Sequence, residues 1–305
     1  MTELARSIVS TIAYFDLFSF PLTTLELWRW LHSDRSQSGC TLHAARCTLS
    51  EIDRSLREDL DIRSRLLTQG GFWFLRGRGE IVAERLRRQR IAERKYARAR
   101  RVSRLLSGIA GVRMIAVANT LALSASRDEG DIDLFVVTKP GALWSVRGTA
   151  AGLLDLLGLR PSNDRSRDAI CLSFLVSDDA LNLSALALPN DPYLAHWVAS
   201  LVSIYDNGGI YDAFWKANEW ILDLLPNAWN RQTIERAARP LFPIPTPPDT
   251  FARKYQWKRF PPLIREMMNL DSRVVVNDYM LKFHTNDRRE EFRDRWIEKC
   301  REMNL

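Results

Sequence analysis

Two aspartates in the middle of the chain have the spacing of ligands for metal ions that act on phosphate. Asp131 and Asp133 flank one isoleucine at the start of the apolar, β-branched run IDLFVVT, residues 132–138. Alternate side chains of a strand share a face, so both carboxylates point the same way. Carboxylate oxygens bind Mg²⁺, and paired ions stabilise the attacking and leaving oxygens of phosphoryl transfer. We therefore predict that both are metal ligands and catalytic residues, although a D-x-D pair alone also occurs in loops and helix caps.

The elements around this pair follow a defined order. An apolar strand, VRMIAV (112–117), leads through Asn119 and Thr120 into one or two turns of helix, and the D-x-D then opens a return strand. This order resembles the nucleotidyltransferase superfamily typified by DNA polymerase β, whose signature is a Gly-Ser turn, a short helix and a D-x-D. The resemblance implies an α+β fold in which a small mixed sheet with flanking helices forms the core. It also implies two Mg²⁺ ions and a nucleoside triphosphate (NTP) as substrate.

The same resemblance assigns the phosphate-binding turn. Asn119 stands in the place of the family's glycine and Thr120 in the place of its serine, while Ser124 stands where related chains tend to have glycine. Asn is among the best non-glycine residues for a positive φ, so the turn can form, although its side chain crowds the phosphate. Lys139 and Arg147 follow the metal strand and are further candidates for binding the triphosphate; for Arg147, a plain surface position is the alternative.

The family's third carboxylate has no evident counterpart. The candidate strand, AICLSFLV (169–176), has Ser173 at its polar position, and the nearest carboxylates are Asp168 before it and Asp178 and Asp179 after it. Without that group a general base is missing. Two hypotheses therefore stay open: a Mg²⁺-dependent enzyme that transfers a nucleoside monophosphate to an unknown acceptor, or a catalytically inactive protein of the same fold that binds nucleotide or nucleic acid.

Further stretches resemble an uncharacterised bacterial group of predicted nucleotidyltransferases. The group has an N-terminal winged helix, a TKPG-x-LW stretch (here 138–144) and an FH-x-x-D stretch (here 283–287). His284 in the last stretch is a candidate phosphate contact or a core histidine. Three helical patterns and a hairpin around Gly70 and Gly71 predict a winged-helix domain over residues 1–77. Its candidate recognition segment, 50–60, is net acidic, so packing is favoured over DNA reading; a regulator that senses nucleotide is the third hypothesis.

The rest of the chain divides into three segments. We predict a basic connector helix at 78–104, a nucleotidyltransferase core at 105–188, and a helical C-terminal region at 189–305 with a Pro-rich extended connection at 239–250. The helical pattern starts at 76, and residues 76–104 carry twelve Arg or Lys against three Glu. This helix is either a phosphate track for nucleic acid or a solvated connector with one packed face.

Composition sets the outer limits. The 305 residues carry a net charge of +7, which favours anionic partners. No apolar run approaches the ~20 residues that cross a bilayer, and the first segment reads as a helix, not a signal peptide, so we expect a cytoplasmic protein without a membrane partner. His32, Cys40, His43 and Cys47 lie close in sequence, but they lack standard zinc spacing. The acceptor, the base and the oligomeric state do not follow from the sequence.

Overall fold

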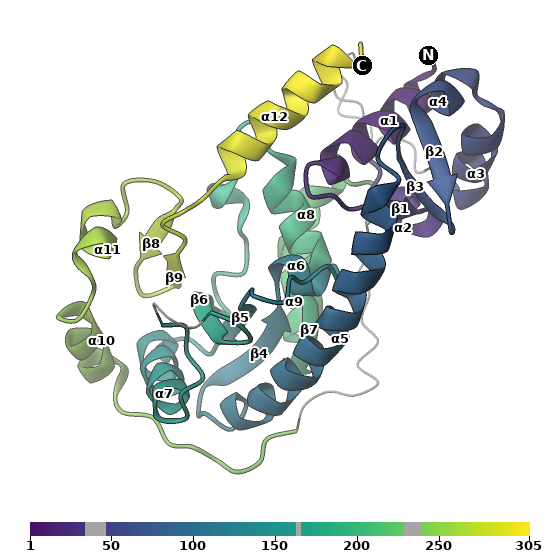
Figure 1. Cartoon of the computed structure of the whole chain (residues 1–305). Helices are drawn as coiled ribbons and strands as arrows, with labels where there is room; N and C mark the ends of the chain where they lie inside the picture. Colours follow the sequence, from purple (N-terminus) through teal and green to yellow (C-terminus); the bar gives the residue numbers. More distant parts are fainter. Residues whose placement is uncertain (34–46, 163–165, 229–238) are drawn as a thin grey trace.

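The computed structural model describes residues 1–33, 47–162, 166–228 and 239–305, which form two sheets surrounded by helices (Figure 1). The chain is therefore of the α+β class, as predicted. The α-helices are α1 (Glu3–Asp16), α2 (Thr24–Arg29), α3 (Leu49–Glu58), α4 (Leu60–Arg65), α5 (Glu80–Leu106), α6 (Asn119–Ala122), α7 (Leu143–Leu156), α8 (Pro192–Ser200), α9 (Ile210–Ala217), α10 (Asp249–Trp257), α11 (Pro262–Met267) and α12 (Arg289–Glu302). The strands are β1 (Leu22–Thr23), β2 (Leu66–Gln69), β3 (Phe72–Leu75), β4 (Val112–Val117), β5 (Ile132–Thr138), β6 (Ile170–Ser177), β7 (Val202–Asp206), β8 (Val274–Val276) and β9 (Met280–Phe283). No helix among these is long and apolar enough to cross a membrane.

The N-terminal part forms from strong local signals. Thr23 caps α2 and Thr48 caps α3, each in a capping box with the glutamate three residues later. The hairpin of β2 and β3 turns at Gly70 and Gly71, which have φ values of 59° and 82°. A two-residue hairpin turn with positive φ at both positions favours this dipeptide. The predicted helices and hairpin are confirmed, and β1 adds to the hairpin to make a sheet of order β1-β3-β2.

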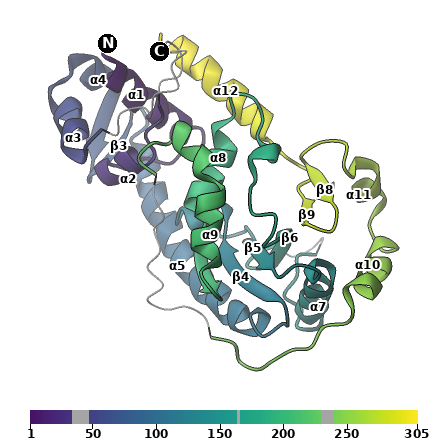
Figure 2. The same ribbon diagram turned by 180° about the vertical axis from the view of Figure 1, so that it is seen from behind.

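Helix α5 begins at Glu80, two residues after the predicted start at 78 and four after the start of the helical pattern at 76. Gly77 has a φ of 87°, and the backbone N–H of Arg76 donates to the carbonyl of Arg65 and so extends the hairpin. From Glu80 the helix runs past the central sheet (Figures 1 and 2). Several of its basic side chains form ion pairs within the protein: Arg85 with Glu26, Arg87 and Arg88 with Glu84, and Arg94 with Asp128.

The central sheet has six strands in the order β7-β4-β5-β6-β9-β8. Only β5 and β6 pair in parallel; the other neighbours are antiparallel. Strands β4 and β5 lie at the predicted residues. The prediction of a helical region over 189–305 is wrong in part, because β7, β8 and β9 lie within it. These strands are so short that hydrophobic periodicity cannot distinguish them from helix, and pairing with β4 and β6 decides their conformation.

The two faces of the sheet are covered differently. Ala116, Phe135 and Phe174 belong to one buried cluster with α8, α9 and the N-terminal helices, whereas Ile115 and Leu134 belong to another with α5, α7 and α10. The first cluster is continuous across the predicted domain boundary at residue 77. Residues 239–248 of the predicted connection form neither helix nor strand, while Asp249 and Thr250 belong to α10. The N–H of Ile244 donates to the Gly108 carbonyl at 2.7 Å.

A buried pair of histidines lies where the N-terminal helices meet α8. The Nε2 atoms of His32 and His196 are 2.7 Å apart, and Tyr14 stacks on His196 with ring centroids 4.7 Å apart. Burial lowers the pKa of His32 to about 3 and that of His196 well below its usual range. Both rings are therefore neutral at pH 7, so one Nε2 donates and the other accepts. His32 thus packs in the core; of the other candidate zinc ligands, Cys40 and His43 lie outside the described residues.

Mild acid should destabilise the protein through this pair. The folded pKa values lie below the unfolded value of ~6.5, so the stabilisation is present above pH 6.5 and is lost as the pH falls towards 3. Between pH 7 and 5 the two rings should remove about 4 kcal/mol of unfolding free energy. Urea unfolding at pH 7 and at pH 5 measures this loss of stability. In His32→Gln only His196 remains to titrate, so the loss between the two pH values should be roughly half as large. An identical pH dependence in the variant would contradict the prediction.

Candidate functional site

Three side chains of types that can bind a metal ion meet at one end of the parallel strand pair. Asp131 immediately precedes β5, Asp133 lies within it, and Cys171 lies on β6 directly opposite Asp133. Their ligand atoms all lie within 4.8 Å of one another. The structure therefore brings together the two aspartates that were predicted to act together. Sequence reasoning missed Cys171, although alternation from Ser173 leads to it, because only carboxylates were considered.

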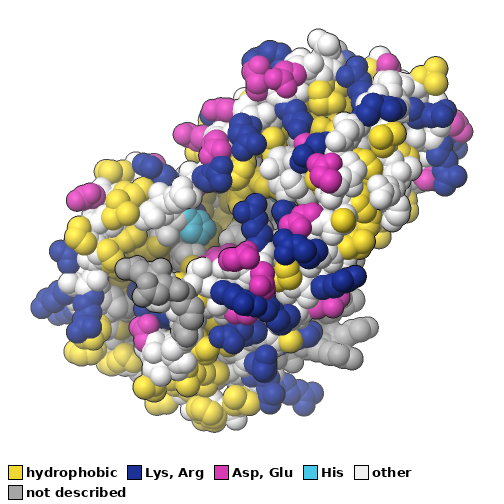
Figure 3. Space-filling view, viewed as in Figure 1, with side chains coloured by type: hydrophobic (Ala, Val, Ile, Leu, Met, Phe, Trp, Pro, Cys, Tyr) yellow, Lys and Arg dark blue, Asp and Glu magenta, His cyan; other side chains and the backbone are white. Residues whose placement is uncertain are grey.

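A bulge in β6 shapes the pocket beside these residues. Asp133 pairs with Cys171 but Phe135 pairs with Phe174, so β6 carries one extra residue between these pairs. As a result Cys171, Ser173 and Phe174 all line one pocket of about 460 Å³, together with Asp133. Figure 3 shows a hollow near the middle of the molecule with basic and acidic side chains on its rim. The pocket is large enough for a small ligand.

The two carboxylates repel each other, and the charge of Lys95, which opposes the rise that burial causes in the pKa of Asp131, offsets this repulsion only in part. Within the described residues neither forms an ion pair. Burial, and then the charge of Asp131, raise the pKa of Asp133 to about 6; burial also raises the pKa of Asp131. Burial and the same two carboxylates raise the pKa of Cys171 to about 12, so its thiol is protonated at pH 7. A divalent cation at this point would balance the carboxylate charge.

Asn119 occupies the turn that was predicted to hold phosphate. Its φ is 55°, and Ser124 has a φ of 53°, so both residues adopt the left-handed backbone that glycine favours. The side-chain oxygen of Asn119 accepts a hydrogen bond of 2.9 Å from Trp197 Nε1, and its amide bonds to Asp133. The turn therefore forms with asparagine at this position, but the Asn119 side chain lies in the pocket. Ser124 instead lines a second pocket, beside α2 and α5.

Besides Ser124, three more of the five predicted phosphate-binding residues lie away from this pocket. Thr120 is exposed on α6 and does not line it. Lys139 follows the opposite end of β5 from Asp131, so the length of a seven-residue strand separates the two residues. Arg147 lies on α7, on the other face of the sheet, where its Nη1 donates to Gln256 Oε1 at 2.6 Å and its guanidinium lies 4.5 Å from the Phe283 ring centroid. The assignment of Lys139 and Arg147 to the site is therefore corrected.

The acidic candidates for a third ligand are also used elsewhere. Asp168 forms ion pairs with Lys95 at 2.9 Å and with Arg94 at 3.1 Å. Asp178, with Asp179 after it, follows the far end of β6 and lies 3.4 Å from Arg113. The place facing Asp133 belongs to Cys171.

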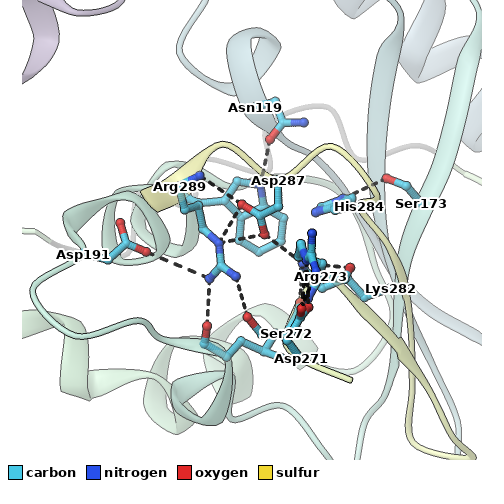
Figure 4. A network of polar contacts seen from close by, with 12 residues as sticks. Asn119, Ser173, Asp191, Asp271, Ser272, Arg273, Lys282, His284, Asp287 and Arg289 are labelled. Carbon is cyan, nitrogen blue, oxygen red and sulfur yellow. Dashed lines mark hydrogen bonds and ion pairs between the residues drawn. The ribbon is translucent and has the colours of Figure 1, made fainter. Parts of the chain in front are cut away.

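Residues near the C-terminus complete the pocket, and sequence reasoning had assigned only His284 among them. Asp287 bonds to Arg289 at 2.9 Å and lies 3.4 Å from Lys282 Nζ (Figure 4). His284 Nε2 lies 3.1 Å from the Ser173 hydroxyl. Burial, and then the charge of Lys282, lower the pKa of His284 to about 4, so the imidazole is neutral at pH 7. The pocket thus contains the Asp133 carboxylate together with the basic side chains of Lys282 and Arg289, which their ion pairs with Asp287 hold in place.

Lys95 fixes the turn that carries Asp131. This lysine of α5 is fully buried, and its Nζ donates to the carbonyls of Gly130 and Asp128. A buried ammonium must be paired and hydrogen-bonded to be tolerated, and Asp168 supplies the counter-charge. Lys95 is therefore a positioning residue for the site, not a free cation of the basic helix.

Substitution of Asn119 should separate its two roles. Asn119→Ala and Asn119→Gly both remove the bonds to Trp197 and Asp133, but only alanine must strain to reach a φ of 55°. We expect the alanine variant to be less stable than the glycine variant by about 1 kcal/mol. Urea unfolding of the two variants measures the difference, and equal stabilities would contradict it.

Asp133→Asn should stabilise the cation-free protein at neutral pH. A folded pKa of about 6, above the unfolded value, means that the carboxyl stabilises the fold below about pH 4 and that this is lost as the pH rises through 6. We expect a gain on the order of 2 kcal/mol at pH 7.5 in the presence of a chelator, and none at pH 4. Asp287→Asn, which removes a paired carboxylate, should instead lose stability. Thermal unfolding of both variants is the measurement, and a destabilised Asp133→Asn would contradict the expectation.

Comparisons with protein-family models, with curated proteins and with solved structures gave no match for this chain.

Proposed function

We propose that this chain is a nucleotidyltransferase of the polymerase-β type that transfers a nucleoside monophosphate from an NTP to an acceptor and releases pyrophosphate. One observation carries the proposal: Asp131 and Asp133 lie close together without an ion pair among the described residues, and Asp133 lines a pocket that basic side chains also line. A divalent cation and a polyphosphate together satisfy both features, because the cation neutralises the carboxylates and the bases contact phosphate oxygens.

Each residue then has a definite task. The carboxylates of Asp131 and Asp133 would hold Mg²⁺, which when bound draws negative charge from the phosphates. Lys282, Arg288 and Arg289 line the same pocket and would bind the triphosphate. Partners such as Asp287 already fix Lys282 and Arg289, so these cations lose little freedom when they bind a ligand. An acceptor that is already anionic would need no general base.

A second function is supported by a different observation. The Asn119 side chain bonds to Asp133 and Trp197 within the phosphate turn, and a thiol stands where the family has its third carboxylate. Both features suit a protein of the same fold that binds nucleotide without transferring it. NTP binding tests the site common to both functions, and pyrophosphate release distinguishes them.

The N-terminal helices and hairpin support the proposal of a winged helix in residues 1–77, and its shared core with the sheet favours a packing role. A nucleic-acid partner finds support only in exposed cations of α5 such as Arg90, Arg100 and Arg104. The third hypothesis, a regulator that senses nucleotide, would need both the winged helix and the exposed cations of α5.

NTP binding should depend on both the cation and the aspartates. We expect calorimetry to show binding of at least one NTP with Mg²⁺, and the Asp131→Asn/Asp133→Asn variant should weaken it more than about tenfold, or ~1.4 kcal/mol. Asp178→Asn/Asp179→Asn makes the same charge change at the far end of β6, so it should bind like the wild type. If no NTP binds to the folded wild type, or if both variants behave alike, the proposal is wrong.

A further inference from the structure

The ligand set of the cluster is mixed. Two ligands are carboxylates, but the third is the Cys171 thiol, which β-sheet pairing places directly opposite Asp133. Mg²⁺ is a hard cation that takes oxygen ligands and demands regular octahedral geometry. Sulfur is a soft ligand that favours Zn²⁺ and later transition metals. The carboxylates fit the magnesium ion that the family resemblance implies, whereas the thiol does not.

We propose that Asp131, Asp133 and Cys171 form a binding site for one borderline-soft divalent cation of the Zn²⁺ or Co²⁺ type. Asp133 and Cys171 come from two hydrogen-bonded strands, so the sheet holds their backbone positions, and Asp131 immediately precedes β5. Asp133 and Cys171 also line a pocket of about 460 Å³, which leaves a coordination position open to water or to a phosphate oxygen.

The distances suit such an ion. Zinc binds oxygen at ~2.0–2.2 Å and sulfur at ~2.3 Å, so the ligands of one tetrahedral ion lie roughly 3.5 Å apart. The three ligand atoms lie within 4.8 Å of one another, and small side-chain rotations close that gap. When the ion binds, the Cys171 thiol releases its proton to solvent and the sulfur donates as a thiolate. Three protein ligands with an open fourth position are typical of catalytic zinc sites.

The carboxylates of this cluster differ from neighbouring carboxylates, which already form ion pairs with basic side chains. Asp168, next to the cluster, already has Lys95 and Arg94, and Asp287, across the pocket, has Lys282 and Arg289. Within the described residues Asp131 and Asp133 have no such partner. The inference needs the cation site of the proposed function, but it does not need nucleotidyl transfer.

Cobalt is a direct probe of the thiolate bond. The whole protein, stripped of metal by a chelator, is titrated with Co²⁺ without nucleotide, and the near-ultraviolet absorption is recorded. We expect one Co²⁺ per chain, with a sulfur-to-cobalt charge-transfer band. Cys300→Ser, which removes a thiol on α12, should keep the band, whereas Cys171→Ser should abolish it. Zn²⁺ competition should show that Cys171→Ser weakens zinc binding more than about tenfold, since even residues that only support a metal ligand have effects of that size.

A second variant tests the inference even if Cys171→Ser does not fold. Cys171→Asp supplies an all-oxygen ligand set, so it should bind Co²⁺ without the band and should bind Mg²⁺ more tightly than the wild type. The inference is overturned if wild-type protein fails to bind Co²⁺, binds it without the band, or keeps the band in Cys171→Ser. If the protein shows no band but binds NTP in the presence of Mg²⁺, the metal inference is wrong and the proposed function is kept. If the protein shows the band but binds no NTP, the metal site is kept and the proposed function is wrong.

Discussion

The parallel pairing of β5 and β6 is the constraint on which the site depends. Its register places Asp133 opposite Cys171, and the bulge after that pair turns Ser173 and Phe174 into the same pocket. A shift by one residue would send the Cys171 side chain to the other face, because side chains alternate along a strand. Register is held by the buried residues that follow, Phe135 against Phe174 and Val137 against Val176, so the hydrophobic core determines the chemistry of the pocket.

Around this pair the molecule distributes its charges unevenly. Asp287 lies between Lys282 and Arg289, and Asp168 lies beside Lys95, so these carboxylates are stabilised by the fold itself. Asp131 and Asp133 remain close together and without a cation among the described residues. Such an arrangement destabilises the folded chain, and local conflicts of this kind are expected at functional sites. The same argument separates this cluster from the structural ion pairs on α5.

The long basic helix has a larger structural role than its charge suggests. Arg85 is buried and pairs with Glu26 of α2, while Lys95 holds the turn before Asp131. The helix thereby ties the N-terminal helices to the sheet at one end and supports the site at the other. The shared core beneath α1 and α8, with its two histidines, strengthens this connection. A cation in the sequence is thus a poor guide to phosphate binding when burial and pairing are unknown.

The sequence by itself determined the local elements and the aspartate pair. Capping boxes at Thr23 and Thr48, the Gly70-Gly71 turn and the apolar runs of β4 and β5 are short-range signals, and Asp131 and Asp133 share a face because a strand repeats every two residues. Tertiary structure decided the rest. It placed Cys171 opposite Asp133 and paired β7 and β9 with the central sheet, although both strands are too short to be predicted from their own sequence. It also placed Lys139 and Arg147 away from the site. Those outcomes depend on contacts between residues far apart in the chain, and periodicity within a segment carries no information about its partner.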